Sequence, residues 1–298
     1  MTEDNGKILI LISVLIGLIF FTWQVGSKTI NSQIASLSYL TETINDFSQK
    51  NNFDVPVEIA LVVGADLKTI YYTKNIDKKT PIASLTKLIS AMVIIDNYDL
   101  TDTLVIPREA IGLPETKSIF GAGETMRTFD LLAALLIESS NEAAYTLAYN
   151  WPKIEGSLEQ KKTYFIEAMN RKAKEIGLLE THFSDPAGLD DDNSLSTAWD
   201  VAIMARQALR YQLIQQLTTK ETFTAFSIEG RRHTFENSNK LLTVVPNIKL
   251  GKTGFTDGAG PSLVLIVNQE TKPIILVLLN AQDRFLNAQE LLEKLNFE

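Results

Sequence analysis

The sequence predicts an α/β fold of the α+β type: an antiparallel sheet flanked by helices, with an inserted helical lobe. Apolar, strand-like runs occur over 57–72 and again over 249–279, whereas the stretch from about 98 to 222 has mainly helical periodicity. Because the strands come from both ends of the chain, the helical lobe is an insertion within one unit. The 298 residues, 45% hydrophobic and 21% charged, suffice for an ordered domain of this kind.

The strands of this sheet follow from their apolar patterns. Residues Val57 to Val63 form a mostly apolar run, Gly64 to Asp66 supply a turn, and Ile70 to Tyr72 complete a hairpin. Further strands are expected over 223–228, 249–255, 262–267 and 273–279.

The expected helices carry apolar residues three or four positions apart. One covers 84–97, and another covers 129–149 with a break near Ser139–Asn141. Two amphipathic helices are expected over 160–176 and 197–213. A last helix closes the domain, and its apolar positions are Phe285, Ala288, Leu292 and Leu295.

The amino-terminal region, 1–28, is predicted to be a transmembrane anchor. Residues 8–27 contain no charge, and about 20 such residues in a helix span the hydrocarbon layer. No small-x-small cleavage site follows, so we expect a permanent anchor in preference to a cleaved signal peptide. Residues 29–54 are polar with apolar residues at helical spacing, as in a linker or stalk helix, and 55–298 form the globular domain.

Composition excludes several classes of function. A net charge of −8, with no cluster of Lys and Arg, argues against a nucleic-acid partner. The absence of cysteine excludes disulfides, thiolate metal sites and a cysteine nucleophile. With His182 and His233 as the sole histidines and no Gly-x-Ser-x-Gly sequence, neither a histidine metal site nor a serine–histidine triad is expected.

Ser84-Leu85-Thr86-Lys87 places a hydroxyl and an amine one helical turn apart, on the same face. A neutral lysine in this position can take the proton of the serine, which requires burial or neighbouring cations. N–H groups at the start of the helix can stabilise an oxyanion. Alone, the pair is better explained as an N-cap serine and an exposed lysine, since composition predicts roughly one such pair per chain.

Two further motifs favour a catalytic role for Ser84 and Lys87 over the explanation by capping. Ser139-Ser140-Asn141 offers a hydroxyl for proton transfer and an amide for a peptide bond, although by itself it is typical of a polar loop with capping residues. Lys252-Thr253-Gly254, on an expected strand, offers a cation and a hydroxyl to a carboxylate, and its glycine permits close approach of a substrate backbone. Each motif occurs once, and all three occur in the order shared by penicillin-binding proteins and related β-lactamases.

The sequence around these motifs resembles the D-alanyl-D-alanine carboxypeptidases, the low-molecular-mass penicillin-binding proteins, over about residues 55 to 296. This resemblance implies a serine β-lactamase/DD-peptidase-like fold and a DD-peptidase catalytic domain at 55–298. The resembling segments are Pro81–Leu88, Asp130–Leu132 with Ser139–Ala144, Thr181–Phe183 with Pro186–Leu189, Ser196–Ala198, and Lys252–Gly260.

The resemblance implies that the enzyme acylates its serine with the penultimate D-alanine of a pentapeptide stem and releases the terminal D-alanine. The implied nucleophile is Ser84, its general base is Lys87, and Ser139 passes a proton to the leaving amine. Asn141 would bind the peptide, Lys252 and Thr253 would meet the substrate carboxylate or that of a β-lactam, and Gly254 would be a further substrate-binding residue. The backbone N–H groups of Ser84 and Phe255 would form the oxyanion hole, and neither a metal nor an organic cofactor is implied.

Three alternatives remain beside the carboxypeptidase. A peptidoglycan DD-endopeptidase would use the same site and differ in what fits beyond the scissile bond. A class A β-lactamase needs a glutamate for deacylation, and the Glu-x-x-Leu-Asn setting of that residue does not occur in this chain. A catalytically idle penicillin-binding membrane protein is disfavoured by the intact Ser84, Lys87, Ser139 and Lys252.

The implied substrate also predicts a location. We expect a single-pass protein of the cell membrane, held in the lipid bilayer by residues 8–27, with an extracytoplasmic catalytic domain. The positive-inside rule gives only a weak indication of the orientation, because Lys7 precedes the segment and Lys28 follows it. The outward orientation is therefore inferred from the substrate.

Overall fold

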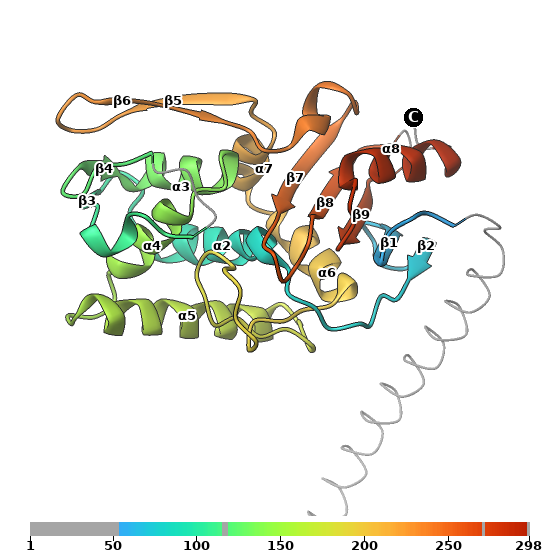
Figure 1. The fold of residues 1–298 in the computed structure, drawn as a ribbon, viewed down its shortest axis with the longest axis horizontal. Helices are drawn as coiled ribbons and strands as arrows, with labels where there is room; N and C mark the ends of the chain where they lie inside the picture. The colour runs from blue at the N-terminus through green and yellow to red at the C-terminus, as the bar shows by residue number, and fades with distance from the viewer. Residues whose placement is uncertain (1–53, 115–118, 270–271, 297–298) are drawn as a thin grey trace, which may run out of the picture. The chain divides into compact units, whose positions relative to one another are not determined.

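The computed structural model describes residues 54–114, 119–269 and 272–296 (Figure 1). They belong to one unit, Phe53–Glu298. Within these described ranges, no helix is both long enough and apolar enough to cross a membrane. The expected anchor at 8–27 and nearly all of the expected stalk at 29–54 lie outside the described residues.

The central layer is a five-stranded antiparallel sheet in the order β2-β1-β9-β8-β7 (Figure 1). Strand β1, from the start of the domain, pairs with β9, so the prediction of a sheet built from both ends of the chain is confirmed. The strands are β1 (Ile59–Gly64), β2 (Ile70–Lys74), β7 (Ile248–Gly254), β8 (Ser262–Val267) and β9 (Ile274–Leu279).

Helices cover both faces of this sheet. Helix α6 (Ala198–Ala208) contacts β1, β8 and β9, and α8 (Arg284–Lys294) also contacts β8 and β9 (Figure 1). Every residue of β1, β8 and β9 is consequently buried. This explains why these strands have continuous apolar sequences and lack the alternation of a half-exposed sheet.

The helical lobe lies beyond the β7 edge of the sheet (Figure 1). A short 3-10 helix, η1 (Ala83–Thr86), leads directly into α2 (Lys87–Asn97), which packs against α3, α5 and α6. The other lobe elements are α3 (Thr128–Ile137), α4 (Asn141–Tyr149), α5 (Leu158–Glu175), α7 (Gln212–Thr218), β3 (Thr103–Val105), η2 (Arg108–Ala110), β4 (Thr125–Arg127), and the hairpin β5 (Thr222–Phe226) with β6 (Arg232–Glu236), followed by η3 (Lys240–Thr243).

The structure corrects the expected helix over 197–213. Helix α6 ends at Ala208, and the chain turns through Tyr211, whose extended backbone precedes α7. Two side-chain contacts hold this turn: the Tyr211 hydroxyl donates to Asp96 Oδ2 at 3.1 Å, and Gln215 Nε2 donates to the carbonyl of Leu209 at 2.6 Å.

The strand expected over 223–228 forms as β5, but it pairs with β6 in a separate two-stranded sheet. Strand β6 was not predicted. Its sequence, Arg-His-Thr-Phe-Glu, buries only His233 and Phe235, so its apolar signal is weak.

Candidate active site

Ser84 lies in η1, one turn before α2 begins at Lys87. Their side chains meet, with Lys87 Nζ 2.5 Å from Ser84 Oγ. The end of β7 packs against the same turn, because a Cβ on Gly254 would lie 3.1 Å from the backbone nitrogen of Ser84. Gly254 therefore permits η1 itself to approach the strand, in addition to the role predicted for it toward a substrate.

The amine of Lys87 is completely buried, and it contacts three oxygen atoms of the part of the chain that the structure describes. Besides Ser84 Oγ, these are Asn141 Oδ1 at 2.7 Å and the carbonyl oxygen of Ala187 at 2.9 Å. The Asn141 amide nitrogen donates in turn to the carbonyl of Pro114 at 3.1 Å. The asparagine of the second motif thus contacts the lysine of the first and also lines the pocket described below.

Ser139 occupies the turn between α3 and α4 with a left-handed backbone, φ +68°. The turn is fixed from its far side by Ser140, whose hydroxyl oxygen accepts from the N–H of Ala143 and caps α4. Lys252 on β7 donates to Ser139 Oγ at 2.7 Å and to the carbonyl of Thr253 at 3.0 Å. This contact joins the sheet to the helical lobe across the site.

Lys252 is almost completely buried, at 1% exposure. Burial lowers its pKa well below the ordinary lysine value, and the positive charges of Lys87 and Arg284 lower it further. A lysine that faces a substrate carboxylate was expected here. Its amine donates to Ser139, which lines the pocket described below, and its role toward a carboxylate stays a prediction.

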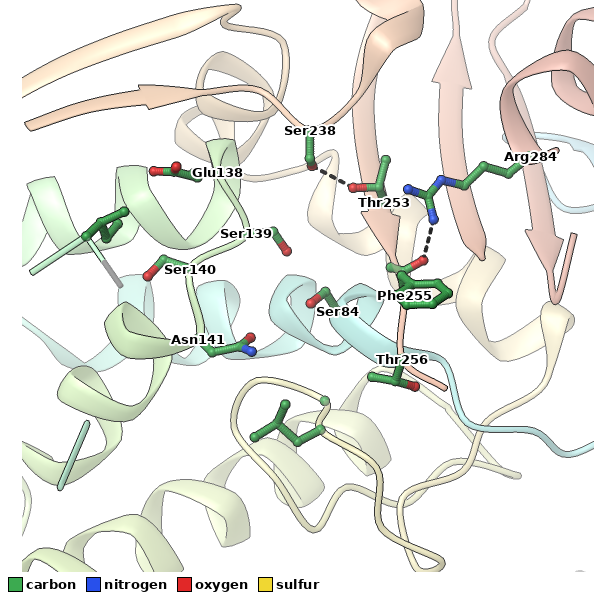
Figure 2. A pocket seen from close by; sticks show the side chains of 14 residues that line it. Ser84, Glu138, Ser139, Ser140, Asn141, Ser238, Thr253, Phe255, Thr256 and Arg284 are labelled. Atoms are coloured by element: carbon green, nitrogen blue, oxygen red, sulfur yellow. Dashed lines mark hydrogen bonds between the residues drawn. The ribbon is translucent and has the colours of Figure 1, made fainter. Parts of the chain in front are cut away.

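A pocket opens between the lobe and the edge of β7, and it is lined by Ser84 and Ser139, the serines that these two lysines contact (Figure 2). Its wall includes the three segments that carry the motifs and the glycine turn at 188–189. The lining residues are Ser84, Ile119, Glu138, Ser139, Ser140, Asn141, Gly188, Leu189, Ser238, Thr253, Gly254, Phe255, Thr256 and Arg284.

Four pocket residues lie outside the predicted motifs and the resembling segments: Ile119, Glu138, Ser238 and Arg284. The Ser238 and Thr253 hydroxyls are 2.6 Å apart, and Arg284 Nη1 donates to the carbonyl of Gly254 at 2.8 Å (Figure 2). Together with Thr253, Ser238 and Arg284 supply two hydroxyls and a cation to the pocket, which are suitable partners for a carboxylate. No local motif marks either residue, since Ser238 lies in an Asn-Ser-Asn stretch and Arg284 merely begins α8.

The described residues contain no group of three or more His, Asp or Glu side chains placed to hold a metal ion. The chemistry that these residues can perform is nucleophilic attack by a serine beside a buried amine, with a second serine and a second buried amine across the site.

Comparison with known proteins agrees with this arrangement. Residues 45–283 match the model of the D-alanyl-D-alanine carboxypeptidase family, Peptidase_S11. A D-alanyl-D-alanine endopeptidase of Pseudomonas aeruginosa is 35% identical over 231 residues, which cover 76% of this chain and 72% of the relative. The D-alanyl-D-alanine carboxypeptidase DacF of Bacillus subtilis is 29% identical over 228 residues, covering 74% of this chain and 57% of the relative.

Solved structures share the fold. The DD-transpeptidase of Streptomyces K15 superimposes with a TM-score of 0.76 at 22% identity, covering 82% of this chain and 98% of that one. A D-alanyl-D-alanine carboxypeptidase from Mycobacterium tuberculosis H37Rv gives a TM-score of 0.72 at 24% identity, covering 82% and 92%. The predicted fold class is confirmed, and on the strength of the family match this chain belongs to the D-alanyl-D-alanine carboxypeptidase family of serine peptidases.

Proposed function

We propose that this protein is a serine-type D-Ala-D-Ala carboxypeptidase that removes the terminal D-alanine of peptidoglycan stem peptides through an acyl-enzyme on Ser84. The observation that carries the proposal is the buried amine of Lys87, 2.5 Å from Ser84 Oγ. Membership of the family and the pocket that Ser84 lines support it.

The surroundings of Lys87 suit it to act as the general base. A neutral amine has two hydrogens and one lone pair. Asn141 Oδ1 and the Ala187 carbonyl are acceptors, so they take both hydrogens. The lone pair is then left facing the Ser84 hydroxyl, whose proton it accepts as Ser84 Oγ attacks the carbonyl carbon of the penultimate D-alanine.

The acylation step needs two further contributions. The oxyanion that forms on the substrate carbonyl is stabilised by the backbone N–H groups of Ser84 and Phe255. When the peptide C–N bond breaks, Ser139 delivers a proton to the leaving amine, and the proton that Lys87 took from Ser84 replaces it on Ser139. Lys252 supports this role, since it donates to Ser139 Oγ at 2.7 Å and keeps that hydroxyl in the site. Water then hydrolyses the ester on Ser84.

The terminal carboxylate of the substrate binds beside Thr253. The Thr253 and Ser238 hydroxyls offer hydrogen bonds there, and the Arg284 guanidinium offers a positive charge. Lys252 contributes its charge as well. Gly254 presents strand backbone to the peptide, and Asn141 lies on the opposite wall of the pocket. A β-lactam carboxylate would use the same contacts, and attack of Ser84 on the β-lactam carbonyl, which breaks the ring C–N bond, would make these antibiotics covalent inhibitors.

A DD-endopeptidase is the second candidate function. It is favoured by the relatives from Pseudomonas aeruginosa and Escherichia coli K12, which are named D-alanyl-D-alanine endopeptidases and are 35% and 34% identical to this chain. The same residues would cleave a cross-link, because only the group beyond the scissile bond changes.

The proposed location follows from the substrate and from the amino-terminal sequence. Residues 1–28 serve as a single-pass anchor in the cell membrane, with 8–27 in the lipid bilayer, and 29–54 serve as a linker or stalk. Residues 55–298 form the catalytic domain on the extracytoplasmic side, where peptidoglycan is found. The support is the uncharged run of residues together with the family.

Labelling with a fluorescent penicillin tests the function. We expect a stable adduct on the wild-type protein that is lost in Ser84→Ala. Folded protein without an adduct would contradict the proposal, and rapid turnover of the drug would indicate a β-lactamase. Release of D-alanine from a pentapeptide, compared with cleavage of a cross-linked dimer, then separates carboxypeptidase from endopeptidase.

A further inference from the structure

The loop after α5 folds into a tight turn against the first turns of α2. Ser90 Oγ donates to the carbonyl of Pro186 at 2.7 Å, and Lys87 Nζ donates to the carbonyl of Ala187 at 2.9 Å. The next residue, Gly188, has φ +82°, and a Cβ there would lie 2.0 Å from the carbonyl oxygen of Ala83. The turn is therefore pressed against the helix that carries the nucleophile.

Asp185 ties this turn together from within. Its Oδ1 accepts from the backbone N–H groups of Ala187 at 2.8 Å, Gly188 at 2.7 Å and Leu189 at 3.0 Å. Its Oδ2 accepts from the hydroxyl of Tyr145 on α4. The carboxylate is 8% exposed, so four donors converge on a buried acceptor. Burial and, next, the charge of Asp185 raise the pKa of Tyr145, which keeps the proton that it donates.

We infer that Asp185 is a positioning residue for the base, which it orients through the carbonyl of Ala187. The inference rests on the proposed function, in which Lys87 takes the proton of Ser84. One peptide unit carries both contacts, because its N–H belongs to Gly188 and its carbonyl belongs to Ala187. The unit is planar and trans, so an N–H held by Asp185 directs the carbonyl to the opposite side, toward Lys87.

A fixed carbonyl decides where the lone pair of Lys87 lies. With one amine hydrogen held by Ala187 and the other by Asn141, the lone pair faces Ser84 Oγ. If the peptide unit between Ala187 and Gly188 rotates, the amine of Lys87 can rotate about its last carbon–nitrogen bond. Its lone pair then no longer points toward Ser84 Oγ. Proton transfer depends on this alignment, so the rate of acylation falls even though Lys87 and Ser84 remain present.

Asp185 also acts on the charge of the amine. A negative charge one peptide unit away favours the protonated form of an amine, and a neighbouring cation such as Lys252 opposes it. Glu142 on α4 is a further acidic residue of this region, and its carboxylate accepts from the N–H groups of Ile119 and Phe120. Removing the Asp185 charge therefore lets Lys87 lose its proton at lower pH.

The test is the rate of acylation of the full-length protein by a fluorescent penicillin, measured from mildly acidic to alkaline pH. In Asp185→Asn we expect the alkaline plateau to fall roughly tenfold or more. We expect the acidic limb of the profile to move to lower pH at the same time. Asp192→Asn is the matched control, because it removes an exposed carboxylate from the same loop and should preserve both plateau and limb.

Two results would overturn the inference. One is a folded Asp185→Asn protein with the wild-type profile. The other is a rate lowered equally at every pH with an unmoved limb, which a merely structural role predicts. If Asp185→Asn does not fold, the same measurement on Asp185→Ser decides, since the serine oxygen can still accept from an N–H two residues on. A wild-type protein without an adduct on Ser84 would contradict the proposed function itself, so the two failures are distinct.

Discussion

The amine of Lys252 donates a hydrogen bond to Ser139 Oγ at 2.7 Å and thereby connects β7 of the sheet to the turn between α3 and α4. The two residues are far apart in sequence and belong to the two parts between which the pocket opens. The contact places the amine of Lys252, at 1% exposure, in the same buried region as the amine of Lys87. Such an arrangement is useful to catalysis and costly to folding.

Replacing Lys252 by methionine should therefore abolish acylation and increase stability. We expect a gain of roughly 0.5–2 kcal/mol in the free energy of unfolding at neutral pH, because the buried charge and its repulsion from Lys87 disappear. Denaturant unfolding of Lys252→Met and wild type measures the gain. An active variant, or a variant less stable than wild type at neutral pH, would contradict this account.

The gain should also depend on pH in a defined direction. The pKa of Lys252 is lowered in the folded protein, so the unfolded chain binds more protons and wild-type stability rises with pH. The destabilising effect is complete below the folded pKa and is lost as pH approaches the ordinary value of 10.5. The difference between Lys252→Met and wild type should shrink over that window, and a constant difference would argue against burial as its cause.

Features of the fold that leave a local pattern in the sequence could be predicted. The apolar runs of β1, β8 and β9 and the break at Ser139 could be predicted, because burial on both faces and helix capping leave marks within a few residues. The roles of Ser238 and Arg284 could not be predicted. Ser238 contacts Thr253 and Arg284 contacts Gly254, and each comes from an element other than β7. Tertiary contacts between single polar side chains leave no periodic signal.

The environment of Lys87 shows the same limit. Its spacing from Ser84 is local and could be predicted, but the acceptor that completes its surroundings is the backbone carbonyl of Ala187, one hundred positions away. No residue type encodes a carbonyl. In the sequence, only family resemblance marks the stretch Pro186–Leu189, and its role depends on the packing of this turn against α2.

The glycine of this turn gives the next prediction. Gly188→Ala adds a Cβ that would lie 2.0 Å from the Ala83 carbonyl, at a φ of +82°. We expect a loss of about 3–5 kcal/mol in unfolding free energy, because both backbone strain and a clash with backbone must be relieved. Gly230→Ala is the control: its φ is +88°, no atom lies within 4 Å of the added Cβ, and strain alone should cost about 1–2 kcal/mol. Equal losses would show that the contact with Ala83 is unimportant.

Asp190 provides a prediction about the oxyanion hole. Its carboxylate accepts from the Thr256 hydroxyl and from the N–H of Gly258 at 2.9 Å, which fixes the chain just after Phe255. Asp190→Asn should lower acylation about tenfold, less than the loss of an oxyanion donor itself. The pH profile should keep its shape, because the base is untouched.

Thr256 supplies the controls for this prediction. Thr256→Val should reproduce the effect of Asp190→Asn, and Thr256→Ser, which keeps the hydroxyl, should not. Both substitutions remove the same contact, the one between Thr256 and Asp190. The double variant Asp190→Asn with Thr256→Val should therefore lower the rate of acylation by less than the two single effects combined. If the two effects simply add, Asp190 and Thr256 act independently and the shared contact does not explain either effect.

Arg284 yields the last prediction, which concerns recognition of the substrate carboxylate. The guanidinium lines the pocket, donates to the carbonyl of Gly254 at 2.8 Å and, among the described residues, has no partner for its buried Nε. Arg284→Gln removes a charged hydrogen bond worth about 1.5–3 kcal/mol, so kcat/KM for a D-alanyl-D-alanine peptide should fall roughly 10- to 100-fold. Arg284→Lys keeps the charge without the planar guanidinium, so its kcat/KM should lie between those of wild type and Arg284→Gln. The decisive comparison uses the same peptide with a carboxamide terminus, on which wild type and Arg284→Gln should be nearly equal. If the variant loses as much on the amide as on the acid, Arg284 supports the end of β7 and does not bind the carboxylate.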